Sequence, residues 1–231
     1  MGRRVIALVA AIVGMGTAMS AQAQLKPETQ TGSLIADQPH GLDAKQAGIV
    51  RKQFAQCVFQ SAKPKALALL EHSDTATIDL QGSGIKNVVK DLNMERCLGE
   101  QVLIDERALG MKFGHDVLRD LMAEEAYLAK NSVAPRLAAD ASPLKLNIVS
   151  TGSQLIMAQE LATFGDCAIR RDVAGADALL RTMPGGEAER GAAAALAPAL
   201  GACLVAGQTV TLKPANIRAL VAHAMWSRFG R

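Results

Sequence analysis

Apolar side chains recur at helical spacing in one segment of each half of the chain. In the first segment they fall at positions i, i+4, i+7 and i+8, which lie on one face of a helix. These residues are Val50, Phe54, Cys57 and Val58. In the second segment, Leu161, Phe164 and Ala168 form the corresponding stripe. The pattern predicts a helix over residues 42–61 and a similar helix over residues 153–170.

Proline and glycine mark the elements that follow each of these helices. Pro64 predicts the start of a short second helix, because proline fits the first helical turn. Glycine-rich breaks at 82–84 and 184–186 each precede a third helix. The first of these third helices holds Cys97, and the second is predicted over residues 187–205.

The rest of the pattern completes the two halves and separates them. Closing helices are predicted over residues 115–130 and 214–229. Residues 24–41 contain proline and glycine and few apolar side chains, which predicts a flexible N-terminal tail. Residues 131–152 form a linker. Short extended pieces are expected at residues 102–104, 144–149 and 209–212. The predicted fold class is therefore mainly α, with minor extended pieces.

The two halves share specific residues as well as periodicity. A phenylalanine stands three residues before a cysteine in both halves, as Phe54 before Cys57 and as Phe164 before Cys167. An alanine follows nine residues after each cysteine, and two leucines follow twelve and thirteen residues after it. These matches align the first two predicted helices of each half.

The alignment continues to the end of each half. A second cysteine followed by leucine occurs in both halves, at Cys97 and Cys203. Each closing helix also has an arginine followed eight residues later by an aromatic residue. These pairs are Arg119 with Tyr127 and Arg218 with Trp226. The chain's single tyrosine and single tryptophan therefore occupy equivalent places.

We interpret these matches as a tandem duplication of one unit of about four helices. Repeat unit 1 covers residues 42–130, and repeat unit 2 covers residues 153–231. The spacing from the second cysteine to the arginine is 22 residues in the first unit and 15 in the second, so a loop differs in length. The alternative is that two alanine-rich helical segments look alike by composition. Composition easily matches leucines, but it does not easily place two cysteines, a phenylalanine, an arginine and an aromatic in one order.

The N-terminus has the three parts of a secretory signal peptide. Arg3 and Arg4 supply positive charge, an apolar run without charges follows, and Ala21-Gln22-Ala23 ends it with small residues. A membrane anchor is the alternative, but a span needs about 20 apolar residues and this run has about 15. We therefore predict a cleaved signal peptide over residues 1–23. The expected destination is the periplasm, with the extracellular space as the alternative.

Cleavage there leaves a nearly neutral protein of about 208 residues. The whole chain has 25 Lys and Arg against 22 Asp and Glu, and the signal removes two arginines and no acid. The remaining excess of one positive charge gives no basic surface for nucleic acid. No later apolar stretch is long enough for a membrane span. Aromatic residues are only 3% of the chain, so the core must consist mainly of aliphatic side chains.

Export and an even number of cysteines predict disulfide bonds. Four cysteines allow three pairings, and a duplicated unit favours pairing within each copy. These pairs are Cys57 with Cys97 and Cys167 with Cys203. Each bond would join the first helix of its unit to the third, and the chain-entropy model gives about 4 kcal/mol for each loop. Metal or redox chemistry is the alternative, but no Cys-x-x-Cys motif occurs and no histidine stands at ligand spacing from a cysteine.

Residues with catalytic chemistry are scattered, and we predict no catalytic residue, metal site or cofactor. The four histidines are His40, His72, His115 and His223. They form no metal-binding motif, so each is expected at the surface or at a helix cap. Glu124 and Glu125 are adjacent on a helix, point in different directions and are expected to be solvated. His115, near Asp116 or Asp120, is the only local candidate for hydrolase chemistry.

Arg119 and Arg218 are the polar residues that the repeat retains. In a functional interpretation they are anchors for a ligand or a protein partner. In a structural interpretation, each arginine pairs with a neighbouring acid or caps a helix end. Either interpretation makes these two residues the first to examine in a structure.

Three hypotheses for function remain open. The most favoured is a non-catalytic exported interaction or structural protein whose two units present a helical face or groove to an unknown partner. The second is a binding module for a small apolar ligand held between the units. The third is a hydrolase with dispersed catalytic residues, which would need a serine or histidine beside a carboxylate in a cleft.

Overall fold

A computed structural model describes residues 42–231, apart from residues 101–113, 139, 206, 208 and 209. Within this part of the chain the regular structure is helical, with no strand and one isolated β-bridge between Ser73 and Ile78. The helices are α1 (Ala44–Ser61), α2 (Lys63–Glu71), α3 (Val88–Asp91), α4 (Met94–Glu100), α5 (His115–Lys130), α6 (Gly152–Arg171), α7 (Val173–Arg181), α8 (Glu187–Ala195), α9 (Ala197–Gly201), α10 (Pro214–Met225) and the π-helix η1 (Trp226–Gly230). The predicted mainly helical fold is confirmed.

Local capping explains where several helices begin. The carboxylate of Asp43 accepts a hydrogen bond from the backbone N–H of Gln46, and the Gln46 side chain accepts one from the N–H of Asp43. This reciprocal capping box satisfies two N–H groups that have no partner inside α1. Pro64 occupies the first turn of α2, as predicted. Asp172 caps α7, since its carboxylate accepts a hydrogen bond from the N–H of Gly175.

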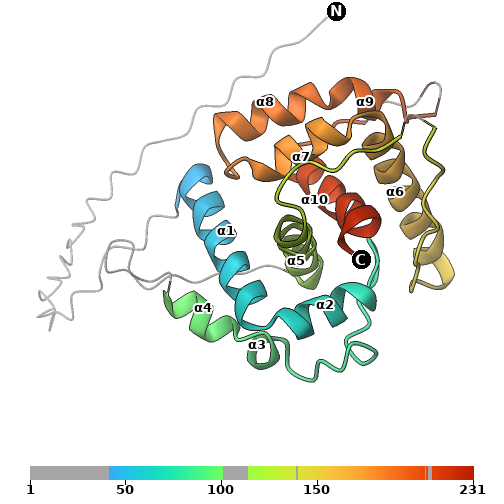
Figure 1. The fold of residues 1–231 in the computed structure, drawn as a ribbon. Helices are drawn as coiled ribbons and strands as arrows, with labels where there is room; N and C mark the ends of the chain where they lie inside the picture. The colour runs from blue at the N-terminus through green and yellow to red at the C-terminus, as the bar shows by residue number, and fades with distance from the viewer. Residues whose placement is uncertain (1–41, 101–113, 139, 206, 208–209) are drawn as a thin grey trace, which may run out of the picture. The chain divides into compact units, whose positions relative to one another are not determined.

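The closing helices α5 and α10 pack against each other and lie between the other helices (Figure 1). α5 also packs on α1 and α2, and α10 packs in the same way on α6 and α7. The first helix of each half contacts a later helix, which is α4 for α1 and α9 for α6. Several helix contacts in one half thus have a counterpart in the other, whereas the contacts of α8 with α7 and α10 have no counterpart of similar extent for α3 or α4.

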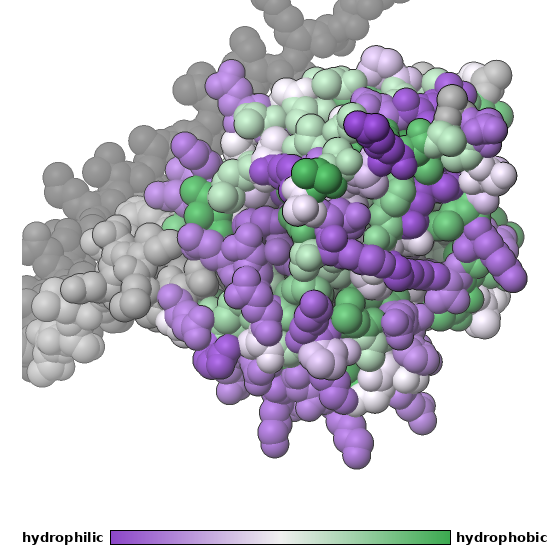
Figure 2. Space-filling view, viewed as in Figure 1, coloured by the Kyte–Doolittle hydropathy of each residue, from purple (hydrophilic) through white to green (hydrophobic). Residues whose placement is uncertain are grey.

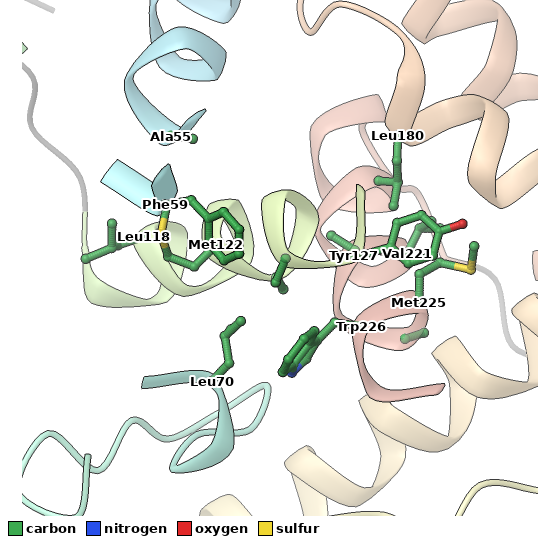
Figure 3. Close-up of a cluster of buried hydrophobic side chains, with 14 of the residues drawn as sticks. Ala55, Phe59, Leu70, Leu118, Met122, Tyr127, Leu180, Val221, Met225 and Trp226 are labelled. Atoms are coloured by element: carbon green, nitrogen blue, oxygen red, sulfur yellow. The ribbon is translucent and has the colours of Figure 1, made fainter. Parts of the chain in front are cut away.

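Apolar side chains from both halves belong to one core (Figure 3). The labelled members are Ala55, Phe59, Leu70, Leu118, Met122, Tyr127, Leu180, Val221, Met225 and Trp226. Removal of apolar surface from water is the main stabilising contribution in such a core, at about 25 cal/mol for each Å². The described residues accordingly fall within a single compact unit, Pro39–Arg231.

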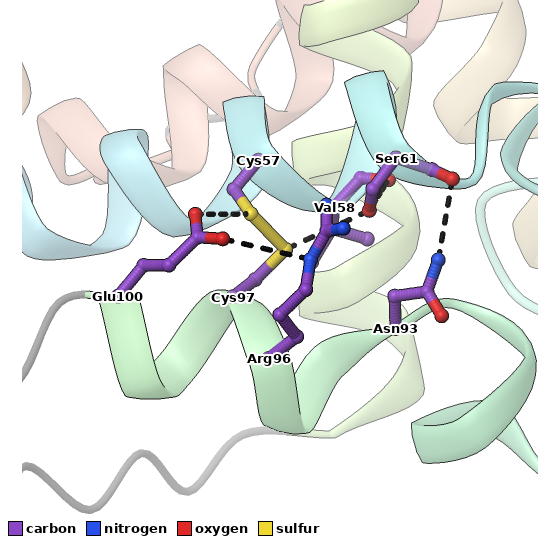
Figure 4. The surroundings of a disulfide bond; sticks show 7 residues. All are labelled: Cys57, Val58, Ser61, Asn93, Arg96, Cys97 and Glu100. Carbon is purple, nitrogen blue, oxygen red and sulfur yellow. Dashed lines mark hydrogen bonds and ion pairs between the residues drawn. A yellow bond between two sulfur atoms is a disulfide. The ribbon is translucent and has the colours of Figure 1, made fainter.

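Both predicted disulfides are confirmed. The Cys57–Cys97 bond joins α1 to α4 (Figure 4), and the Cys167–Cys203 bond joins α6 to the segment that follows α9. The Cα atoms are 5.6 Å apart in the first pair and 6.0 Å apart in the second, which is usual for disulfides. Each bond links the first helix of its half to a later part of the same half.

The first helix of each half also contacts a loop of the other half. On α1, a Cβ atom at Gly48 would lie 2.2 Å from the carbonyl oxygen of Pro184, in the loop after α7. In that loop Gly185 has a φ of +78°, a conformation that favours glycine. On α6, the carbonyl oxygen of Ala158 accepts a hydrogen bond from the hydroxyl of Thr75, in the loop after α2. Gly48 and Ala158 each stand nine residues before the first cysteine of their half, so the two contacts involve matched positions.

The structure interrupts two of the predicted helices. The single helix expected over 187–205 is instead α8 followed by α9, because Pro198 has no N–H to continue the helical hydrogen bonds. The helix expected over 214–229 is α-helical only to Met225 and continues as the π-helix η1.

The short extended piece predicted at residues 144–149 does not form a strand. The backbone N–H of Leu144 donates to the carboxylate of Asp166, and that of Val149 donates to the carboxylate of Asp74. Carboxylate side chains of other elements therefore accept backbone hydrogen bonds that a neighbouring strand would otherwise accept. Residues 210–212 have no regular structure. The predicted signal peptide (1–23), the N-terminal tail (24–41), residues 102–104 and residue 209 lie outside the described residues.

Candidate functional site

A groove of about 1350 Å³ lies between the two halves. Residues of α1, α5, α6 and α10 line it, together with the loop after α7 and the segment that follows α9. Much of the lining is apolar. The apolar side chains include Val117, Leu121, Met157, Leu161, Phe164, Leu212 and Leu220. Because both halves contribute helices, the groove depends on how the halves pack.

Several apolar side chains of the groove are exposed to water. Their exposed fractions are 44% for Met157, 38% for Leu161, 68% for Val205 and 52% for Val210. Large contiguous patches of exposed apolar side chains are a common feature of interaction sites. On the face of the molecule drawn in Figure 2, hydrophobic residues lie in small areas among hydrophilic ones.

Five buried charged residues lie where α1, α5, α8 and α10 meet, and we call them the buried charge cluster. They are Lys52, Glu124, Glu125, Glu189 and Arg218. Arg218 binds Glu124 in bidentate geometry, with both N···O distances at 2.7 Å. Lys52 forms ion pairs with both Glu124 and Glu125, and Arg218 forms a longer one of 3.4 Å with Glu189. All of these residues except Glu125 line the groove.

Arg218 also holds the end of α7. Its guanidinium donates to the carbonyl oxygens of Leu179, Leu180 and Thr182, at distances of 2.9 to 3.1 Å. The last carbonyl groups of a helix have no partner inside the helix, and a positive charge there is favourable. Arg218 therefore joins α10 to both α5 and α7.

The pKa values of the two adjacent glutamates move in opposite directions. Burial raises the pKa of Glu124, but the hydrogen bonds from Arg218 and the charge of Lys52 outweigh it, so its pKa lies below the usual value. Burial raises the pKa of Glu125, and Lys52 offsets only part of that effect. The cluster has three carboxylates and two cations, and Glu125 is the acid whose charge is least compensated.

Arg119 occupies the matching place in the first half and is 2% exposed. Its Nε donates to the hydroxyl of Ser73 at 3.0 Å, and this hydroxyl donates to the carbonyl oxygen of Leu70 near the end of α2. Its Nη2 lies 2.5 Å from Nδ1 of His223. Burial, and then the charge of Arg119, hold the pKa of His223 well below its usual value. His223 is therefore neutral and accepts the hydrogen bond from Arg119.

The two arginines make reciprocal contacts. Glu124 stands five residues after Arg119, and His223 stands five residues after Arg218. Arg119 binds His223 and Arg218 binds Glu124, so each arginine contacts the fifth residue after the other. Reciprocity of this kind is typical of a two-fold arrangement. In these two contacts α5 and α10 therefore exchange equivalent roles.

A smaller pocket of about 290 Å³ adjoins the groove and is more polar. Thr75 and Asp120 line both cavities. The Asp120 side chain is 32% exposed and lies 3.4 Å from Arg119. Burial raises the pKa of Asp120 to about 6, although the charge of Arg119 opposes this rise. The charge of Asp120 therefore changes just below neutral pH.

The residues considered for hydrolase chemistry are either bonded to other protein groups or, in the part of the chain that the structure describes, exposed without a catalytic partner. The hydroxyl of Ser73 is buried and bonded to Arg119 and Leu70, and His115 is exposed. Among the described residues, no serine hydroxyl donates a hydrogen bond to a histidine. In the same part of the chain, no three His, Cys, Asp or Glu side chains gather to hold a metal ion.

The structure places both arginines singled out in the sequence at the junction of the halves. Arg119 lines the smaller pocket and Arg218 lines the groove, and both are buried and bonded to protein groups. Two expectations about their neighbours are wrong, because Glu124, Glu125 and His223 are buried rather than solvated or at the surface. Glu125 stands seven residues after a buried leucine, which is a local signal for burial. The pairing of Glu124 with Arg218, 94 residues later, has no local signal.

Comparison with protein-family models, characterised proteins and solved structures finds no significant match to this chain. Among the described helices, none combines the length and the apolar character that a membrane span requires. Function is therefore inferred from the groove and its contacts.

Proposed function

We propose that the protein is a non-catalytic exported binding protein whose groove takes an uncharged apolar ligand. The observation that carries this proposal is the groove itself, which has about 1350 Å³, an apolar lining and exposed apolar side chains. Pockets for small ligands usually have about 300–1000 Å³. The groove is therefore large enough for an elongated ligand.

The charges that line the groove favour an uncharged ligand. Four are positive and four are negative, so their formal sum is zero. These residues are Arg51, Lys52, Arg170, Arg218, Asp120, Glu124, Glu160 and Glu189. Three of the positive residues are already paired with acids of the protein. A charged ligand would have to compete with these pairs, whereas an apolar ligand would not.

We further propose that the groove is built by two copies of one helical unit. The matching helix contacts, the two loop contacts of α1 and α6, and the reciprocal arginine contacts support this duplication. An approximate two-fold axis between α5 and α10 would relate α1 to α6 beside the groove. The residues matched in the sequence alignment support the same duplication.

Binding of a neutral fluorescent probe tests the proposal. The oxidised protein is titrated with N-phenyl-1-naphthylamine, which fluoresces in apolar surroundings, and we expect saturable binding to one site. Met157→Glu or Leu161→Glu should weaken binding by about tenfold or more, because each places a charge against the apolar ligand. Ile156→Glu is the matched control on the same helix, since Ile156 is 62% exposed and does not line the groove. Unsaturable binding, or equal effects of all three variants, would contradict the proposal.

A protein segment with an apolar face is the second candidate for the groove. Val205 and Val210 favour it, because they are more than half exposed and a larger partner would cover their outer surface. Organic extraction of the natively purified protein, followed by mass spectrometry, separates the candidates. A small apolar molecule in the extract supports the first. Its absence, together with a copurifying protein that Val205→Glu and Val210→Glu release, supports the second.

A further inference from the structure

The two disulfides occupy matching positions but have different surroundings. Cys57 and Cys167 each stand four residues before the last residue of their helix, in α1 and α6 respectively. The negative end of the helix dipole therefore acts on both sulfurs alike. A difference in reactivity has to come from burial and from neighbouring side chains.

The Cys57–Cys97 bond lies beside Ser61, Arg96 and Glu100, and only its Cys57 end is partly exposed (Figure 4). Cys97 is fully buried, and the hydroxyl of Ser61 lies 3.6 Å from its sulfur. A carboxylate oxygen of Glu100 lies 3.3 Å from the sulfur of Cys57. Arg96 pairs with the same carboxylate at 3.5 Å, so this pair carries no net charge, and the burial of Cys97 is what chiefly limits access of a thiolate to the bond.

The Cys167–Cys203 bond is open to the groove. Both cysteines line the groove and are partly exposed. The last turn of α6 contains Arg170 and Arg171, whereas the last turn of α1 has no basic residue. Arg170 lines the groove together with the two cysteines. The nearby acid, Asp166, pairs with Arg170 and with a second arginine, so positive charge remains in excess.

We propose that Cys167–Cys203 is a site of thiol–disulfide exchange with small-molecule thiols that enter the groove. The thiolate of the small molecule attacks the sulfur of Cys203, the protein S–S bond breaks, and Cys167 leaves as a thiolate near Arg170. Positive charge favours this leaving thiolate, and a better leaving thiolate speeds the exchange.

A second small-molecule thiolate then completes the reaction. It attacks the small-molecule sulfur of the mixed disulfide and releases Cys203 as a thiolate. Water returns to the two protein thiolates the protons that the small thiols lost. Two small thiols are thereby oxidised to one disulfide, and the protein disulfide is reduced to two thiols. This site does not depend on the ligand proposed for the groove.

Timed alkylation measures the two disulfides inside one molecule. The oxidised, folded protein is incubated with reduced glutathione, quenched with iodoacetamide at intervals and mapped by mass spectrometry, with circular dichroism recorded in parallel. We expect Cys167 and Cys203 to be modified about tenfold faster than Cys57 and Cys97, or more. Early samples should contain glutathione bound to Cys203.

Two charge variants act as matched controls. Arg170→Gln combined with Arg171→Gln should slow the reduction of Cys167–Cys203 several-fold, and Glu100→Gln should speed that of Cys57–Cys97. Equal rates for the two disulfides in the unmodified protein, or the reverse order, would overturn the proposal. The proposal would also be overturned if the cysteines reacted only as the circular dichroism signal of the helices is lost, because reaction would then require unfolding.

Discussion

The five residues of the buried charge cluster differ in how well each charge is compensated. Glu124 accepts two hydrogen bonds from Arg218 and also pairs with Lys52. Glu125 pairs only with Lys52, which it shares with Glu124. An ion taken out of water costs several kcal/mol unless partners replace the lost hydration. The lowered pKa of Glu124 and the raised pKa of Glu125 express this difference in free energy.

Neutral replacements of the two glutamates should therefore have unequal effects. Glu124→Gln should destabilise the protein by about 3–5 kcal/mol, because it leaves Arg218 buried without its main partner. Glu125→Gln, one residue away on the same helix, should change stability by less than about 1 kcal/mol, because ionised Glu125 is itself disfavoured by burial. Urea unfolding at neutral pH measures both. Equal losses would show that the pairing with Arg218 is not what distinguishes them.

Asp120 should make stability depend on pH below neutrality. Its pKa is raised from 3.8 to about 6 in the folded protein, so the folded state favours the protonated form. The stabilisation is greatest at low pH and is lost as the pH rises from about 4 through 6. After allowance for partial exposure of the side chain, the loss between pH 5 and 7 is on the order of 1 kcal/mol.

Asp120→Asn isolates this contribution. The variant should lose less stability than the unmodified protein between pH 5 and pH 7, because the amide side chain has no acidic proton to release. Thermal unfolding at the two pH values measures the difference. A parallel pH dependence of the two proteins would assign the effect to other groups.

At the scale of elements, close backbone contact fixes how the halves meet. The N-terminal part of α1 lies against the loop after α7, and α6 accepts a hydrogen bond from the loop after α2. Glycine at position 48 leaves room for the carbonyl oxygen of Pro184, which a Cβ atom would approach to 2.2 Å. Backbone atoms cannot yield to such a contact as a flexible side chain can.

Alanine substitution of two helical glycines should therefore change the stability of the protein in opposite directions. Gly191→Ala in α8 should stabilise the protein by about 0.5–1 kcal/mol, because nothing lies within 4 Å of the new methyl group and alanine favours helix. Gly48→Ala in α1 gains the same propensity but must displace the loop, and we expect a net loss of about 1–3 kcal/mol. Chemical denaturation of both variants provides the comparison. A stabilising Gly48→Ala would mean that the loop moves without cost.

For the whole molecule, the proposed two-fold relation of the halves accounts for the positions of the buried arginines and of the shared apolar core. The closing helices place each matched arginine of one half against the closing helix of the other, and the core is shared. The groove lies where α1 and α6 flank these helices, so it exists only when both halves are in place.

Exchange of the two partners of the arginines tests this relation. Glu124→His and His223→Glu together would move the carboxylate from Arg218 to Arg119. If the halves are equivalent, the double variant should be more stable than the sum of the single changes allows, by about 1–3 kcal/mol. A double-mutant cycle from denaturant unfolding measures this coupling. Additive effects would count against equivalent surroundings for the two arginines.

Much of the architecture was predictable, since it depends on local signals. Periodicity located α1 and α6, proline located the start of α2, and matching cysteines predicted both disulfides. The break at Pro198 was also a local signal, because proline cannot continue the helical hydrogen bonds, but the helix predicted over 187–205 ran through it. Residues 144–149 have the composition of a strand, yet carboxylates of other elements satisfy their backbone.

The helical class, most helix positions and the disulfide pairing could be predicted from the sequence, because spacing, capping and cysteine matching act over short or repeated distances. The burial of Glu124 and His223, the partners of both arginines and the groove depend instead on the packing of the helices. Those features depend on side chains about 100 residues apart that meet only when α5 packs against α10. The free energy of burying such a side chain depends on the charge of its distant partner and on how much water it loses. A local sequence pattern contains neither quantity.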